Sequence, residues 1–357
     1  MQERDELIKL LKSDMNYDSY ELYVWGTGNT SDLYQEGFKR LKKEGVEIRG
    51  YFDNNPAKWG KDYNDKKVLS PEKISEISNA LVLISSPTPE TIRQIGNQLD
   101  EVGVHWIGID AFVLKTHVQE VLSVYDSLAD ERSKSIYFEL VKIRVLGNTI
   151  PEQYVDNNQY FFMEFGNASP KEIFVDCGAY VGDSFECYLW KRAGVFSKAI
   201  LFEPDKRNVK AIERRLARLK DEWNISDDKV LIYPYGLSDT DTVSCLKNND
   251  ALNGLSSKVV DEQNGDGEEL KIVSLDNILE QRDNLFIKAD IESFEYKMIL
   301  GAKNIIQSSK PKLAICIYHN SVDFYDIPLL LKSLNPNYKF SIRHYTANFS
   351  ETVLYAY

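Results

Sequence analysis

Apolar residues along this chain repeat one pattern twice, and the first copy occupies the amino-terminal third. An apolar run at 21–25 leads into a glycine turn and an amphipathic segment. Further apolar runs follow at 46–53, 79–87 and 104–110, with helical spacing at 88–103. Strands that alternate with helices predict a parallel sheet that is covered on both faces.

The second copy of the pattern begins at Glu172. Its predicted strands cover 172–178, 198–204, 230–238, 285–292 and 312–319, and its predicted helices cover 184–194, 206–223 and 293–307. The tail, 338–357, reads as two antiparallel strands in a hairpin. Mostly parallel strands with an antiparallel end are common in doubly wound folds.

A helical stretch from about 111 to 148 separates the two patterns, since apolar residues such as Val121, Val124 and Tyr125 recur there at helical spacing. We therefore predict an α/β protein with two Rossmann-like domains. The expected boundaries are 1–112 for the first domain, 113–165 for a helical connector and 166–357 for the second domain.

Composition and charge limit the classes of binding partner and the expected location of the protein. The 357 residues carry a net charge of −12, which argues against nucleic acid or an anionic membrane as the main partner. No apolar stretch reaches the roughly 18 residues of a membrane span, and the start shows no signal peptide, so we expect a cytoplasmic protein. The four cysteines lack metal-site spacing, so we expect reduced thiols. We assign no metal ligands, and the need for a divalent ion, with Asp290 and Glu292 as its conceivable ligands, stays open. The oligomeric state stays open, and a homo-oligomer is compatible with the sequence.

The stretch 172–185 reads as a buried strand that ends at Asp176 and breaks into spaced glycines, Gly178 and Gly182. Ligands of open α/β sheets bind at the carboxyl ends of the strands, and glycines let a ligand approach the backbone. The stretch has neither the spacing of the dinucleotide fingerprint nor that of a phosphate loop. It predicts a nucleotide site of another kind, and a purely structural turn is the alternative.

Glu203 ends the next strand, in the run "LFEPD", where an acid can accept hydrogen bonds from both hydroxyls of a ribose. Together with the glycine loop it favours an adenosine-type ligand over a strand-end acid that faces solvent. The run "YGLSD" at 235–239 is a weaker signal for a turn that lines an adenine ring.

The run "IKADIESFE" places Lys288, Asp290 and Glu292 two residues apart at a strand end, so their side chains are expected on one side. Burying such charges without a purpose would be costly, although a solvated strand end is the alternative. His319 ends the last parallel strand at the same edge, and site and structural roles are weighed equally for it. The polar run 253–258 is either a loop that covers substrate or a mobile loop.

Taken together, the motifs "VDCGAYVGDSF", "LFEPD", "YGLSD", "SLDNIL" and "KADIESFEYKMILGA" resemble FkbM-type S-adenosylmethionine-dependent methyltransferases over about 150–357. The resemblance implies a class I methyltransferase fold and O-methylation of a hydroxyl on a sugar, glycan or related natural product, with a role in polysaccharide biosynthesis. It implies S-adenosylmethionine as cofactor, held by these residues: Asp176, Gly178, Tyr180, Gly182, Glu203, Pro204, Leu237 and Ser238.

The resemblance also implies that Lys288, Asp290 and Glu292 lie beside the transferred methyl group. Asp290 is the first candidate for the base that removes the acceptor's proton, and His319 is the second. Tyr180 and Ser293 depart from the family pattern, which has Asn and Gly there. Ser293 puts the acceptor's identity in doubt.

The amino-terminal domain carries half of a dinucleotide fingerprint, with Gly26 and Gly28 after the first strand and Asp53 at the end of the second. Three interpretations stay open: a nucleotide or nucleotide-sugar site, a scaffold that positions a glycan, or a module that serves only interaction. Two rival functions follow for the chain. One is a sugar-nucleotide-binding or assembly protein with an inactive methyltransferase domain, and the other is an NAD-dependent oxidoreductase.

Overall fold

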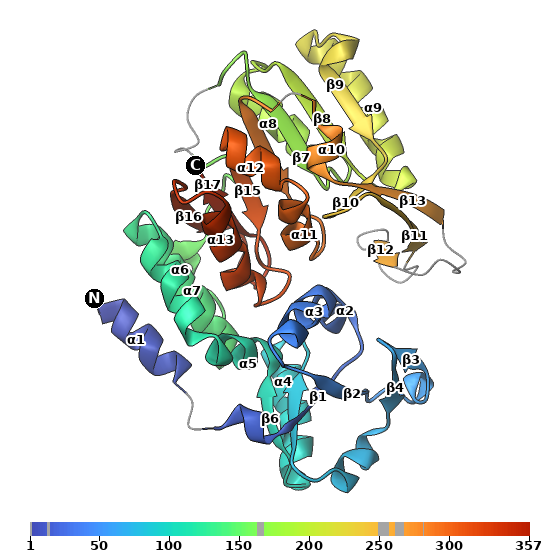
Figure 1. Ribbon diagram of the computed structural model, residues 1–357, viewed down its shortest axis with the longest axis vertical. Coiled ribbons are helices and arrows are strands. Elements are labelled where there is room, and N and C mark those ends of the chain that lie inside the picture. Colours follow the sequence, from blue (N-terminus) through green and yellow to red (C-terminus); the bar gives the residue numbers. More distant parts are fainter. Residues whose placement is uncertain (1, 13–14, 163–167, 249–256, 261–267, 281) are drawn as a thin grey trace. The chain divides into compact units, whose positions relative to one another are not determined.

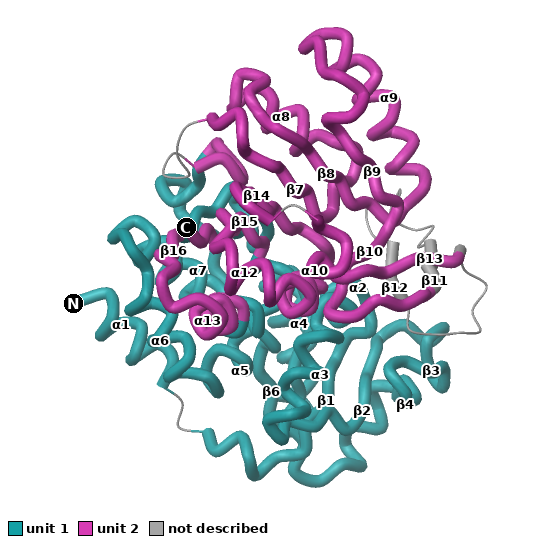
Figure 2. Tube along the Cα trace, turned by 45° about the horizontal axis from the view of Figure 1, so that its top comes forward, with its two compact units in different colours: residues 1–156, 317–326, 342–352 teal, residues 157–316, 327–341, 353–357 magenta. Residues whose placement is uncertain are grey.

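The computed structural model describes residues 2–12, 15–162, 168–248, 257–260, 268–280 and 282–357 (Figure 1). Residues 253–256 of the predicted covering loop lie outside the described residues. The chain forms two compact units (Figure 2). The first comprises 1–156, 317–326 and 342–352, and the second comprises 157–316, 327–341 and 353–357.

The first unit contains a six-stranded sheet in the order β3-β4-β2-β1-β5-β6. Strand β1 (Glu21–Trp25) pairs in parallel with β2 (Ile48–Phe52) and β5 (Ala80–Ile84). Strand β5 pairs in parallel with β6 (His105–Gly108), and β2 with β4 (Lys66–Leu69). The four predicted strands are therefore confirmed, and a short antiparallel partner, β3 (Asp62–Tyr63), is added beside β4.

The helices of the first unit lie before, between and after its strands. They are α1 (Gln2–Leu11), α2 (Asn29–Leu33), α3 (Gln35–Lys43), α4 (Pro89–Glu101), α5 (Ile109–Thr116), α6 (Val118–Ser127) and α7 (Glu131–Leu146). Helix α7 begins where the Asp130 carboxylate accepts from the backbone of Ser133, and it ends at Gly147 in a left-handed conformation. The helical stretch expected between the two patterns thus forms α5, α6 and α7, all within the first unit.

The second unit is built on a seven-stranded sheet in the order β16-β17-β15-β14-β7-β8-β9. Strands β7 (Ile173–Cys177), β8 (Lys198–Phe202), β9 (Val230–Tyr233), β14 (Leu285–Ala289) and β15 (Lys312–Cys316) run in parallel. Strand β17 (Thr352–Ala356) is antiparallel to β15, and β16 (Phe340–His344) lies at the edge. Every residue of β7 and β14 is buried, as expected for strands that are covered on both faces.

The helices of the second unit connect these strands. They are α8 (Asp183–Arg192), α9 (Lys206–Trp223), α10 (Leu275–Ile278), α11 (Glu295–Leu300), α12 (Lys303–Ser309) and α13 (Asp323–Leu334), whose first residues belong to the first unit. The helix predicted over 293–307 is two helices. The break falls at Gly301, where a Cβ would lie 2.1 Å from the carbonyl oxygen of Ser238, so the chain passes too closely there for a larger residue.

A four-stranded sheet in the order β10-β13-β11-β12 was not predicted. It consists of β10 (Gly236–Leu237), β11 (Thr242–Asn248), β12 (Ser257–Val260) and β13 (Glu268–Val273). Its sequence is rich in polar residues, which hides the strand signal. The strand predicted over 230–238 divides into β9 and β10 around Pro234, which has no N–H to donate to a ladder. Among the described residues, no helix is long and apolar enough to cross a membrane.

Candidate functional site

The turn after β7 has a backbone that only particular residues accept. Gly178 and Gly182 have φ of +82° and +80°, and Tyr180 between them has φ of +46°. A Cβ on Gly178 would lie 2.0 Å from the carbonyl oxygen of Asp290, whereas one on Gly182 would lie 3.5 Å from its nearest neighbour. Gly178 is therefore required both by its backbone and by the close approach of the turn after β14.

A buried ion pair lies under this turn. Asp176 and Lys288 face each other in the parallel register of β7 and β14, and the Lys288 ammonium lies 3.1 Å from the Asp176 carboxylate. Lys288 also donates a hydrogen bond of 2.7 Å to the carbonyl oxygen of Gly178, and the Ser184 hydroxyl donates to Asp176. Lys288 thus connects both strands to the glycine turn.

Each charge of the pair stabilises the ionised form of the other. Burial alone would lower the pKa of Lys288, but the negative charges of Asp176 and Asp290 outweigh it and raise that pKa, so the ammonium stays protonated. Burial also raises the pKa of Asp176, against the opposing effects of Lys288 and Ser184. Lys288 was expected among the catalytic residues, and its contacts give it a role in fixing the turn.

Glu203 lies directly after β8 and is 6% exposed. One carboxylate oxygen accepts from the backbone N–H of Asp205 at 2.9 Å and from the Asn208 amide at 3.1 Å. The other accepts from the backbone N–H of Tyr180 at 2.9 Å, so Glu203 binds the glycine turn. These bonds use three of the about four acceptor positions of a carboxylate, which leaves room for a ligand hydroxyl.

Burial raises the pKa of Glu203 to about 7, although its three hydrogen bonds act in the opposite direction. A carboxyl group that titrates near neutrality at the mouth of a sheet is typical of a functional site. The other predicted adenosine contacts lie in two further segments. Pro204 follows Glu203, while Leu237 in β10 and the adjacent Ser238 are both 6% exposed.

Asp290 follows β14, and its backbone N–H donates to the carbonyl oxygen of Cys177 at 3.0 Å. Its carboxylate accepts a hydrogen bond of 2.9 Å from the hydroxyl of Tyr160. Asp290 is partly exposed and follows the carboxyl end of β14. This position suits a proton acceptor for a bound ligand.

The expected alternation of side chains ends before Glu292, which corrects its predicted place on the side of Lys288. Strand β14 stops at Ala289, and Glu292 and Ser293 have left-handed φ of +54° and +75°. Glu292 is consequently exposed, and Ser293 occupies a conformation that favours glycine. Glu295, at the start of α11, is fully buried and accepts from the backbone N–H of Ile291 at 2.7 Å.

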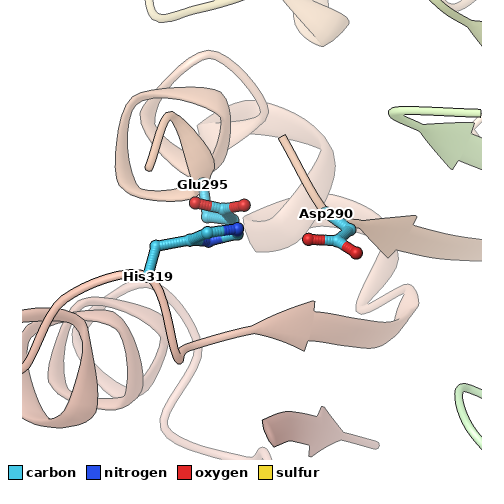
Figure 3. Close-up of side chains that lie close together, drawn as sticks. All are labelled: Asp290, Glu295 and His319. Carbon is cyan, nitrogen blue, oxygen red and sulfur yellow. The ribbon is translucent and has the colours of Figure 1, made fainter. Parts of the chain in front are cut away.

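Figure 3 shows Asp290 after its strand, Glu295 on its helix and His319 in the segment after β15. A carboxylate oxygen of Asp290 lies within 4.8 Å of one of Glu295. Because His319 belongs to the first unit and both carboxylates to the second, the site described here is built from the second unit's residues alone.

The predicted second site, in the first unit, has a carboxylate that is already surrounded by donors. One oxygen of Asp53 accepts from the backbone and hydroxyl of Thr27 and from Lys58, and the other accepts from the backbone of Asn55. Burial opposes ionisation, but these contacts lower the pKa of Asp53. Gly26 is explained by packing, because its φ is +112° and a Cβ would lie 2.7 Å from the carbonyl oxygen of Ser85.

Sequence reasoning missed three side chains that complete the site: Tyr160, Ser184 and Glu295. Tyr160 lies far along the chain from Asp290, so no local spacing reveals it. Ser184 and Glu295 lie inside recognised motifs, and their contacts with Asp176 and the turn after β14 could have been suspected from that position alone.

We predict that Gly178→Ala lowers the free energy of unfolding by about 3 kcal/mol or more, because the methyl group meets the backbone of Asp290. Gly182→Ala is the matched control. It has nearly the same φ, but the new methyl group would come no closer than 3.5 Å to its neighbours, so we expect a loss of about 1–2 kcal/mol. Urea denaturation of both variants measures the difference, and equal losses would contradict the close approach of the two turns.

Comparison with known proteins gives two family matches. Residues 176–340 match the model of the methyltransferase FkbM domain, and residues 18–107 match the C2185-like amino-terminal family. No curated protein matches the chain. The family match begins at Asp176 and therefore includes the glycine turn, Glu203 and the residues around Asp290.

Among solved structures, methyltransferase FkbM from Methylobacillus flagellatus is similar over 99% of both chains, with 19% identity and a TM-score of 0.60. An rRNA methylase from Streptococcus thermophilus covers 53% of this chain and 88% of its own, with 13% identity and a TM-score of 0.32. A Streptococcus mutans protein in complex with SAH covers 55% and 94%, with 12% identity and a TM-score of 0.33. The first of these shows the fold of the whole chain. The family match thus shows that residues 176–340 of the chain are similar to the methyltransferase FkbM domain that its model describes.

Proposed function

We propose that the second unit transfers the methyl group of S-adenosylmethionine to a hydroxyl of a sugar, a glycan or a related product. The observation that carries this proposal is the link between Glu203 and the glycine turn. The carboxylate that would bind the ribose also holds the backbone of Tyr180, so two parts of a donor site are fixed to each other. The match to the FkbM domain supports the same reading.

The residues present suit an adenosine-type donor. Glu203 offers a buried carboxylate oxygen to a ribose hydroxyl, and the turn from Gly178 to Gly182 would contact the amino-acid part. Leu237 and Ser238 would lie near the adenine, and Pro204 would shape the same wall. S-Adenosylmethionine would supply a methyl group that is already electrophilic, so the protein's task is to align the acceptor and remove its proton.

Asp290 is the proposed base. The acceptor oxygen forms a bond to the methyl carbon while the carbon–sulfur bond breaks, and the bonding electron pair stays on sulfur. The hydroxyl proton passes to the Asp290 carboxylate and from there to solvent, so charge and atoms balance. His319 remains the alternative base. Exposed Glu292 is proposed to contact the acceptor, not to take its proton.

The boundaries at 112 and 165, the cytoplasmic location, any homo-oligomer and a role in polysaccharide biosynthesis also remain proposals. The amino-terminal unit, if it binds a ligand, would use Gly26, Gly28 and Asp53 for a nucleotide or nucleotide-sugar. One observation favours the rival function of a binding protein with an inactive domain. Ser293 stands in a left-handed conformation where the family has glycine, and it is 4% exposed.

Binding of S-adenosylhomocysteine should depend on the protonation of Glu203. Because burial raises the pKa of Glu203 to about 7, the carboxyl group is partly protonated at neutral pH and then accepts hydrogen bonds poorly. A ribose hydroxyl favours the ionised form, so we expect affinity to rise from pH 6 to pH 8, with proton release on binding. Below this pKa, the dissociation constant should rise by up to about tenfold for each unit by which the pH falls. Calorimetry in two buffers of different ionisation enthalpy measures both effects.

Glu203→Gln should bind S-adenosylhomocysteine weakly and without this pH dependence. Glu186→Gln is the matched control, since Glu186 lies on α8, pairs with Arg215 and Arg218, and has a pKa lowered by those partners. It should bind like the wild type. Equal affinity of Glu203→Gln and wild type would contradict the assignment of Glu203 to the ribose.

Methyl transfer itself can be measured with tritiated S-adenosylmethionine and a pool of sugars, nucleotide-sugars and oligosaccharides. We expect the wild type to label the pool. Asp290→Asn should lower the rate by about 10²–10⁴-fold, because the amide cannot take the acceptor's proton, while S-adenosylhomocysteine affinity stays within about twofold. Full turnover by Asp290→Asn would exclude Asp290 as the base. Labelling of protein or nucleic acid instead of sugars would contradict the acceptor class.

A further inference from the structure

We infer that Tyr160, which precedes the residues matched by the FkbM model, is a positioning residue that fixes the Asp290 carboxylate at the reaction centre. This inference rests on the proposed function and deepens it. It extends the site beyond the recognised domain to the segment that leads into β7, which sequence reasoning treated only as a connector.

The contacts of Tyr160 are specific. Its hydroxyl donates a hydrogen bond of 2.9 Å to the Asp290 carboxylate, and the Cys316 sulfur lies 3.8 Å from the Tyr160 hydroxyl oxygen. Tyr160 is only 8% exposed. Its φ is +64°, a left-handed conformation that costs a bulky residue energy. Such a conformation persists when surrounding contacts determine it, and it is common at functional sites.

Phe161 supplies those surrounding contacts. Its ring packs at 6.4 Å from Phe174 of β7, 6.1 Å from Tyr188 of α8 and 6.0 Å from Phe286 of β14, measured between ring centroids. Phe161 is 6% exposed, so it anchors the segment in the core of the second unit. With Phe161 fixed, the preceding residue can turn its ring toward the open end of the sheet.

Tyr160 also contacts the ion pair below. The Lys288 ammonium lies 5.1 Å from the centre of the Tyr160 ring, a distance at which a cation is attracted to an aromatic face. Lys288 in turn binds Asp176 and the carbonyl oxygen of Gly178. Tyr160 therefore joins the proposed base to the network that shapes the glycine turn, and all of these groups belong to the second unit.

A phenol in this position orients the carboxylate and favours its ionised form, because a donated hydrogen bond stabilises the charge. It touches Asp290 and not the transferred methyl group, so its effect on the reaction passes through Asp290. Removal of the hydroxyl should consequently weaken what Asp290 does near the methyl position and leave the rest of the donor site intact.

Two donor analogues test this without a known acceptor. S-Adenosylhomocysteine lacks the methyl group, and sinefungin carries an ammonium group where that methyl group stands. If the ionised Asp290 carboxylate faces this position, the wild type should prefer sinefungin by about fivefold or more. Calorimetry gives the affinity ratio for wild type, Tyr160→Phe, Asp290→Asn and the double variant.

We expect Tyr160→Phe to reduce the preference by at least half while its affinity for S-adenosylhomocysteine stays within about twofold. Asp290→Asn should abolish the preference, and Tyr160→Phe should then have no further effect. Tyr188→Phe is the matched control, because its buried hydroxyl donates to a different carboxylate, Glu172, at 3.0 Å. It should keep the wild-type ratio.

Other outcomes overturn the inference. An unchanged ratio in Tyr160→Phe, a parallel loss for both analogues, or an effect that persists on the Asp290→Asn background would each exclude Tyr160 as a positioning residue for Asp290. A wild type that binds S-adenosylhomocysteine but shows no preference for sinefungin would do the same. A wild type that binds neither analogue would overturn the proposed function itself. Failure of the proposed function is thereby distinguished from failure of the inference about Tyr160.

Discussion

The buried ion pair between Asp176 and Lys288 is the constraint on which the candidate site depends. The two residues are partners in the register of β7 and β14, and neither reaches solvent to any extent. Two buried charges are costly unless each has a partner and further hydrogen bonds, and removal of one leaves the other uncompensated. Lys288 meets this condition by binding Asp176 and the carbonyl oxygen of Gly178.

The geometry of the turns follows from this pair. With Lys288 bound to its carbonyl group, Gly178 lies against the backbone of Asp290, and the turns after two neighbouring strands are held together. Glu203 then attaches the third turn through the backbone N–H of Tyr180. Three strand ends thus present carboxylates at one edge, where ligands of open α/β sheets bind.

Sequence patterns predicted the parts of the chain in which local physics and tertiary environment agree. Strands such as β7 and β14 are apolar throughout because both faces are covered, and they end at acids or glycines that local reasoning recognises. The sheet formed by β10 to β13 was missed, since its strands are polar and need their partners to be recognised. Glu292 was expected to continue the alternation of β14, and nothing local shows that this strand ends at Ala289.

The candidate site, like the fold, was predictable where its residues carry a local signal. Asp176, Gly178 and Glu203 stand at strand ends and turns that local patterns recognise, so the sequence alone indicated them as candidates for an adenosine-type ligand. Tyr160 reaches Asp290 through a contact 130 residues apart along the chain, and only the fold brings them together.

In the first unit, half a dinucleotide fingerprint was recognised, but its Asp53 already accepts four hydrogen bonds from Thr27, Lys58 and Asn55. A motif reports which residues are present and not which partners they have taken. This carboxylate would have to exchange donors before it could hold a ribose.

The central claim is that the edge of the second sheet holds the methyl donor. A crystal structure of the protein with S-adenosylhomocysteine tests it most directly. The account predicts the ribose against the Glu203 carboxylate, the amino-acid part along the turn from Gly178 to Gly182, and the sulfur facing Asp290. Density for the ligand at any other place in the chain, with Glu203 keeping its present partners alone, would contradict it.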